Sequence, residues 1–189
     1  SCATVLGEAI SNAWDADAQN VSLYVERSKN QFWSRDDGVG MTAKDFQDKF
    51  LRIGYSKRKG GRTLSARGRP FIGRKGIGKL ALLSCAKRIS VISKVKGGEY
   101  VGGVLDNGGL DQAITQDLTP QQYSLGAPNL AAFSKSTAGH SHGTIIRFDD
   151  LRGGDRHRLA FLEKVIAICF RFSPCDKTFK TSFNDEPYN

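Results

Sequence analysis

Apolar residues recur every three or four positions over the first segment of the chain, which is the spacing of one helix face. The pattern predicts a helix over residues 3–18, with Val5, Leu6 and Ala9 among the positions that repeat. No capping residue precedes this helix, whereas a natural helix start usually has one. We therefore expect the sequence to be a fragment of a longer protein.

Alternating patterns follow the helix. Residues 21–25 and 31–34 are rich in β-branched and aromatic side chains and flank a turn, which predicts a β-hairpin. The later predicted elements are a helix capped by Thr42, a helix that opens at Gly78, strands at 89–93, 100–105 and 144–148, and a helix over 159–172. This order lacks the regular βαβ alternation of a parallel sheet. It predicts a mixed or mostly antiparallel sheet with helices on one face.

Two long stretches show no periodicity. Residues 54–74 are basic and rich in glycine, which predicts a mobile loop. Residues 107–141 are polar and rich in glycine and proline, and we expect a variable insertion there with at most one short strand. The 189 residues suffice for one domain with a sizeable core, so we expect a single domain over 1–189.

Composition narrows the class of protein. The chain is 39% apolar and 25% charged, as in ordinary folded proteins, and no apolar run approaches the roughly 18 residues of a membrane span. The start lacks a secretory signal, and the four cysteines form no C-x-x-C pair, so we expect a cytoplasmic protein, or a nuclear one in a eukaryote. His140 and His142 lack the further ligands of a metal site, which favours a polar loop tip.

The net charge of +9 predicts a polyanionic partner. Basic residues are densest over 57–79, where few acidic residues accompany them. This charge is compatible with binding either nucleic acid or the phosphates of a nucleotide.

Three polar residues share one stripe of the first predicted helix. Glu8, Asn12 and Asp15 lie at positions i, i+4 and i+7, which fall on one side of a helix with about 3.6 residues per turn. An exposed polar face would explain this stripe as well as a ligand site would. Asp37, followed by Gly38 and Gly40, places a carboxylate at a tight turn, where it could accept hydrogen bonds from an exocyclic amine such as adenine N6. An ordinary Asp-Gly β-turn is the alternative.

Glycines also open the helix predicted after residue 78. The segment 73–79 (Gly-Arg-Lys-Gly-Ile-Gly-Lys) can direct backbone N–H groups and the helix dipole toward a phosphate, with Lys79 as counter-charge. A P-loop is excluded because Leu80 stands where a hydroxyl residue should bind Mg²⁺. A Rossmann turn is improbable because no apolar strand precedes the glycines.

Together these segments resemble the GHKL superfamily, which includes gyrase, the ninety-kilodalton heat-shock chaperones, histidine kinases and MutL. Its four motifs are matched in order by residues 8–16, 37–41, 73–78 and 143–144. The resemblance covers roughly residues 5–148, with 107–141 unmatched. It implies an α/β (α+β) two-layer sandwich of the Bergerat type, with a lid and phosphate loop over 54–79.

The resemblance also implies roles for individual residues. Glu8 is expected to be the general base for the attacking water, Asn12 the Mg²⁺ ligand, and Asp37 the residue that binds adenine N6 with help from Thr144. The other expected contacts to ATP are Asp15, Gly40, Met41, Lys57, Gly73, Lys75, Gly76, Ile77, Gly78 and Lys79.

The implied function is binding and hydrolysis of Mg-ATP, with lid closure driving conformational change or dimerisation in a larger machine. The segment 50–57 is similar to chaperone-like, MutL-like and MORC-like members, and Glu8 favours hydrolysis by water over phosphoryl transfer to protein. Two alternatives remain at this point. One is a nucleotide-gated clamp with negligible turnover, and the other is a basic nucleic-acid-binding domain, although the latter leaves Glu8, Asn12 and Asp37 unexplained.

Overall fold

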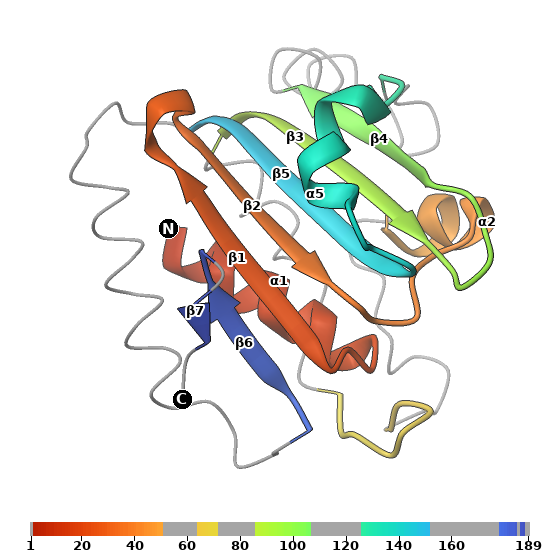
Figure 1. Ribbon diagram of the computed structural model, residues 1–189. Helices are drawn as coiled ribbons and strands as arrows, with labels where there is room; N and C mark the ends of the chain where they lie inside the picture. Colours follow the sequence, from red (N-terminus) through yellow and green to blue (C-terminus); the bar gives the residue numbers. More distant parts are fainter. Residues whose placement is uncertain are drawn as a thin grey trace.

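One mixed β-sheet forms the centre of the molecule (Figure 1). The computed structural model describes residues 2–50, 64–71, 86–106, 126–151, 178–184 and 186–187. The strands are β1 (Asn20–Glu26), β2 (Gln31–Asp36), β3 (Ala86–Lys94), β4 (Val101–Asp106), β5 (Gly143–Leu151), β6 (Lys180–Phe183) and β7 (Glu186–Pro187), in the order β4-β3-β5-β2-β1-β6-β7. In the described sheet β1 and β6 pair in parallel and the other neighbours are antiparallel, which confirms the mixed, mostly antiparallel sheet.

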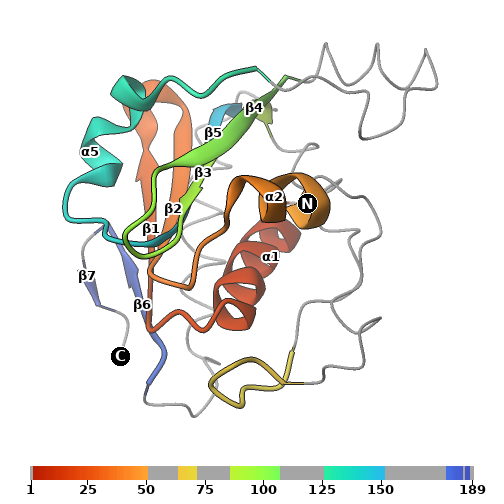
Figure 2. The same ribbon diagram turned by 90° about the vertical axis from the view of Figure 1, so that its right-hand side faces the viewer.

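Helical segments lie on both faces of the sheet, which Figure 2 shows edge-on between α1 and α5, whereas the sequence predicted helices on one face. The described helices are α1 (Cys2–Asp15), η1 (Arg27–Lys29), α2 (Ala43–Asp45), η2 (Phe46–Phe50), η4 (Leu130–Phe133) and α5 (Ser134–Thr137). The predicted first helix, the hairpin and the three later strands are confirmed. The helices predicted after Gly78 and over 159–172 lie outside the described residues.

The main core lies between α1 and the sheet. Leu23 of β1 and Phe32 of β2 point to this side, where they are buried with Ala13 and Trp14 of the helix and Phe148 of β5. The small alanine side chain lets the helix approach the sheet closely. Trp14 adds a large apolar surface, of the kind that contributes roughly 1.5–3 kcal/mol when fully buried.

A smaller core covers the opposite face and explains the helical segment there. Phe133 of η4 is buried against Ile92 and Ile145 of the sheet. The guanidinium of Arg147 lies 4.6 Å from the centre of the Phe133 ring and donates to the carbonyl of Ala132 at 2.6 Å. The end of the predicted insertion is therefore packed on the sheet.

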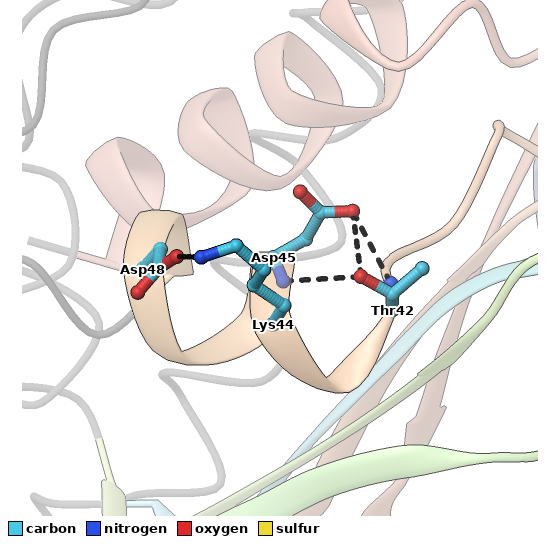
Figure 3. Close-up of polar contacts among 4 residues, drawn as sticks. All are labelled: Thr42, Lys44, Asp45 and Asp48. Atoms are coloured by element: carbon cyan, nitrogen blue, oxygen red, sulfur yellow. Dashed lines mark hydrogen bonds and ion pairs between the residues drawn. The ribbon is translucent and has the colours of Figure 1, made fainter.

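Helix α2 begins at the predicted cap. The Thr42 hydroxyl accepts from the backbone N–H of Asp45, and the Asp45 carboxylate accepts from the backbone N–H of Thr42, which completes a capping box (Figure 3). Lys44 and Asp48 form an ion pair of 2.6 Å one turn apart. That pair is exposed, so the cap fixes the start of the helix more than the pair does.

Residues 64–71, which belong to the predicted mobile loop, are anchored below the end of α1. The hydroxyl of Ser65 donates to a carboxylate oxygen of Asp17. Arg69 is buried, and its guanidinium lies 4.6 Å from the centre of the Trp14 ring. The described part of this loop is therefore held by buried polar contacts, which the glycine-rich composition around it did not indicate.

The turn that follows β2 fits tightly against the end of β3. Gly40 has a φ angle of +73°, and a Cβ atom at this position would lie 1.9 Å from the carbonyl oxygen of Lys94. Both the backbone conformation and the close approach require glycine. The turn therefore has a fixed position relative to the sheet.

We predict that Gly40→Ala destabilises the fold far more than Gly97→Ala. Gly97 has nearly the same φ angle of +74° but has no atom near its Cβ position, so it isolates the cost of the backbone conformation, about 1–2 kcal/mol. Gly40→Ala adds the collision with Lys94, and we expect about 3 kcal/mol or more in total. Urea denaturation of both variants measures the difference, and equal losses would contradict the packing described for this turn.

Candidate functional site

Strand alternation directs the side chain of Asp36 to the side of the sheet that carries α1. Phe32, Ser34 and Asp36 occupy alternate positions of β2, and Phe32 packs in the core under the helix. The intervening Arg35 points to the other face, where it donates to the carbonyl of Ser136 at 3.1 Å. Asp36 is therefore the last side chain of β2 on the helix side.

The Asp36 carboxylate joins the turn to β5. Its Oδ1 accepts hydrogen bonds from the backbone N–H groups of Gly38 at 2.9 Å and Thr144 at 3.2 Å. Within the described residues no hydrogen bond reaches Oδ2, and none of their buried side-chain polar atoms lacks a partner, so Oδ2 keeps accessible surface. One carboxylate oxygen is thus structural and the other can accept from a ligand.

Burial controls the ionisation of this group. Loss of hydration raises the pKa of Asp36 to about 6, although the hydrogen bonds from Gly38 and Thr144 act in the opposite direction. The carboxylate is still mostly charged at neutral pH, when it acts as an acceptor. A polar group with such a shifted pKa, placed beside an accessible surface, is typical of a binding site.

Hydroxyl groups order the neighbouring strand ends. Ser93 Oγ donates to the carbonyl of Gly143 at 3.0 Å and accepts from the backbone N–H of Met41 at 3.0 Å. The Ser93 hydroxyl has one proton, which it donates to Gly143. In the 2.9 Å bond between Ser93 and Thr144, the Thr144 hydroxyl must therefore be the donor. The lone pairs of Thr144 Oγ1 stay available beside the Asp36 carboxylate.

Asp37 has a different environment. Its Oδ1 accepts from the backbone N–H groups of Gln19 at 2.7 Å and Asn20 at 2.8 Å, and its Oδ2 accepts from the Asn20 side chain at 2.7 Å. Burial acts to raise the pKa of Asp37, but the hydrogen bonds from Asn20 and Gln19 outweigh it and lower the pKa. Asp37 thus joins the turn to the start of β1, and its engaged oxygens do not support the adenine contact that the sequence predicted for it.

Only some of the other residues predicted from the sequence belong to the part of the chain that the structure describes. Helix α1 carries Glu8 and Asn12, which are half-buried, and Asp15, which is buried rather than on an exposed polar face. Met41 packs against the main core. Lys57, Gly73, Lys75, Gly76, Ile77, Gly78 and Lys79 lie outside the described residues.

Two histidines belong to this site and were missed as such. His140 Nε2 lies 2.7 Å from the carbonyl oxygen of Asp36, and His142 Nδ1 lies 2.7 Å from that of Gly38. The sequence predicted a polar loop tip here, and only the pairing of β5 with β2 brings this loop against the turn. Within the described residues no group of three or more His, Cys, Asp or Glu side chains could hold a metal ion.

The fold agrees with comparisons to known proteins. Residues 1–144 match the family model described as histidine kinase-, DNA gyrase B-, and HSP90-like ATPase. The chain belongs to this family of ATPases, whose fold is the α/β sandwich observed here.

Two relatives have names that refer to restriction enzymes and to DNA mismatch repair. HgiDII of Herpetosiphon aurantiacus, assigned to the type II restriction enzymes, is 39% identical over 111 residues, which are 58% of this chain and 17% of the relative. The DNA mismatch repair protein MutL of Ehrlichia chaffeensis is 29% identical over 125 residues, or 66% of this chain and 18% of that protein. The matched part is therefore less than a fifth of either relative. In the part of the chain that the structure describes, no helix is long and apolar enough to cross a membrane.

We predict that replacing the two adjacent aspartates changes stability in opposite directions. Because burial raises the pKa of Asp36 to about 6 from 3.8, its charged form costs stability above pH 6. Asp36→Asn should then stabilise the fold by up to about 3 kcal/mol at pH 8, and this gain should disappear as the pH falls from 6 toward 4.

Asp37→Asn is the matched comparison. The pKa of Asp37 is lowered in the folded state, so its charge stabilises the fold above the unfolded pKa. Because solvent screens these partly exposed bonds, the variant should lose only about 0.5–1.5 kcal/mol at pH 8. Urea denaturation at pH 4, 6 and 8 measures both effects. Destabilisation of similar size by both variants would contradict the two environments described.

Proposed function

We propose that this chain binds Mg-ATP with the adenine on Asp36, rather than Asp37, and hydrolyses the nucleotide with Glu8. The observation that carries the proposal is the accessible Oδ2 of Asp36 beside the hydroxyl of Thr144. Membership of the ATPase family supports the ligand class. The hydrogen bonds of the two aspartates favour Asp36 over Asp37 as the adenine-binding residue.

The adenine base suits this turn chemically. Its exocyclic N6 amine only donates in this setting, and a carboxylate oxygen only accepts, so Asp36 Oδ2 is its complement. Thr144 Oγ1, whose proton goes to Ser93, can accept from the same amine or from a bridging water. In this proposal Gly40 lets the backbone approach the base, and Met41, which packs against the main core, contacts the ring.

The phosphate end of the ligand is assigned to helix α1 and the glycine-rich segment. Asn12 offers a carboxamide oxygen to Mg²⁺, a hard cation that prefers oxygen ligands. When bound, Mg²⁺ supplies positive charge that balances the charge of the phosphates. Asp15, Lys57 and residues 73–79 keep the supporting and phosphate-binding roles that the resemblance implies.

Glu8 provides the base for hydrolysis in this proposal. Its carboxylate orients a water molecule and removes a proton from it as the water oxygen bonds to the γ-phosphorus. The bond between the γ-phosphorus and the β–γ bridging oxygen breaks, and ADP and inorganic phosphate leave. Glu8 is half-buried on α1.

The proposal extends to a larger machine that acts on nucleic acid. The named relatives are a mismatch repair protein and a protein assigned to the restriction enzymes, and the net charge of this chain is +9. We propose that ATP binding promotes dimerisation or movement of the full-length protein, and that parts outside this chain use the movement on DNA or RNA.

Nucleotide binding should depend on one aspartate of the pair. Asp36→Ala should weaken binding of Mg-ATP at least about 30-fold, since it removes a charged hydrogen-bond acceptor. Asp37→Ala should change the affinity by less than about threefold if the variant is folded. Isothermal titration of parent, Asp36→Ala and Asp37→Ala gives the three dissociation constants, and a loss confined to Asp37→Ala would return the role to Asp37.

Turnover should depend on Glu8. Glu8→Ala should bind Mg-ATP as tightly as the parent and hydrolyse it about 10²–10⁴-fold more slowly, because it removes the general base. Phosphate release under saturating Mg-ATP is the measurement. Unchanged hydrolysis in Glu8→Ala would remove the general-base assignment, and negligible turnover in a parent that binds ATP would favour the nucleotide-gated clamp.

A further inference from the structure

The two histidines before β5 hold the carbonyl groups of the turn that carries Asp36. His140 Nε2 lies 2.7 Å from the carbonyl oxygen of Asp36, and His142 Nδ1 lies 2.7 Å from that of Gly38. A carbonyl oxygen can only accept, so each of these ring nitrogens must carry a proton. His140 is therefore protonated on Nε2 and His142 on Nδ1.

Tyr100 fixes the ring of His140 from the other side. The Tyr100 hydroxyl lies 2.8 Å from His140 Nδ1, and the two rings are nearly parallel, at 9°. Since Nε2 holds the proton of the neutral ring, Nδ1 accepts and Tyr100 donates. A directed series of hydrogen bonds thus runs from Tyr100 through His140 to the backbone of Asp36.

The surroundings keep His140 neutral. Burial lowers the pKa of His140, and Arg35, Lys94 and His142 lower it further, while the hydrogen bond to Asp36 acts in the opposite direction. A neutral ring has one donor and one acceptor nitrogen, which is what the contacts to Asp36 and Tyr100 need.

The carbonyl directions matter because they fix the backbone from which the carboxylate extends. Asp36 Oδ1 is engaged by the N–H groups of Gly38 and Thr144. The two peptide planes of the turn are each held on one side, because the Asp37 N–H donates to the Asn20 carbonyl at 3.2 Å and the Val39 N–H donates to the Ala16 carbonyl at 2.9 Å. His140 holds the plane after residue 36, and His142 holds the plane after residue 38. Loss of either histidine bond leaves its peptide plane held through the N–H group alone, which loosens the carbonyl side of the turn and shifts Asp36 Oδ2.

We propose that Tyr100, His140 and His142 are positioning residues that set the selectivity of this site for a base with an exocyclic amine. The proposal rests on the adenine contact of Asp36 described above. ATP presents an amine to Asp36 Oδ2, whereas inosine triphosphate presents a carbonyl oxygen, which a carboxylate repels. A correctly held carboxylate therefore favours ATP, and a loosely held one discriminates less.

The test uses amide side chains that copy one ring nitrogen at a time. The amide nitrogen of Gln reaches about the position of Nε2 and that of Asn about the position of Nδ1, so His140→Gln and His142→Asn preserve the donors. His140→Asn and His142→Gln also carry an amide, but its nitrogen lies at the wrong distance from the backbone to donate to the carbonyl. The dissociation constants of Mg-ATP and Mg-ITP are measured by calorimetry for the parent, these four variants and Tyr100→Phe.

The expected result is a selectivity change rather than a general loss. His140→Asn and His142→Gln should reduce the ratio of the two dissociation constants about tenfold, as expected for one lost hydrogen bond. His140→Gln and His142→Asn should keep the ratio within about threefold of the parent value. The ratio for Tyr100→Phe should lie between those of the two groups of variants. A merely structural role would weaken both nucleotides equally, and equal selectivity in all the folded variants would overturn the proposal.

A second measurement needs no nucleotide. Long-range ¹H–¹⁵N correlation spectra of the parent at neutral pH should show His140 protonated on Nε2 and His142 on Nδ1, with single-residue variants assigning the signals. The same tautomer in both rings would overturn the proposal. If the parent binds neither nucleotide, the proposed function fails and this inference fails with it, whereas strong selectivity that no ring variant alters overturns this inference alone.

Discussion

The double hydrogen bond from the backbone to Asp36 Oδ1 is the interaction on which the site depends. It ties the end of β2 to the start of β5 and leaves one carboxylate oxygen accessible beside Thr144. Burial of this charge opposes folding, so other contacts in the structure must offset its cost. Gly40 against β3, the Asp37 bonds to the start of β1 and the two histidines all converge on the same short turn.

Local patterns predicted most of the fold that the structure describes. The helix over the first residues, the hairpin and strand β5 have strong periodicity and short-range pairing, so sequence is sufficient for them. The parallel partner β6 was not predicted, because its pairing with β1 joins residues about 160 positions apart. The same limit applies to η4 and α5, whose attachment depends on Phe133 reaching Ile92 and Ile145.

The proposed choice of Asp36 over Asp37 rests on strand geometry rather than on the motif. Asp37 precedes Gly38 directly and therefore fits an Asp-Gly turn, but strand parity continues from Phe32 through Ser34 to Asp36. Counting alternate positions along β2 places Asp36, and not Asp37, on the helix side of the sheet. No comparable signal existed for His140 and His142, because their partners are backbone carbonyls about 100 positions away.

The most direct test of the account is a crystal structure of this chain with Mg²⁺ and a non-hydrolysable ATP analogue. The account predicts that adenine N6 lies within hydrogen-bond distance of Asp36 Oδ2, near Thr144, while Asp37 keeps its bonds to Gln19 and Asn20. A base that contacts Asp37, or one that lies away from the turn after β2, would contradict it.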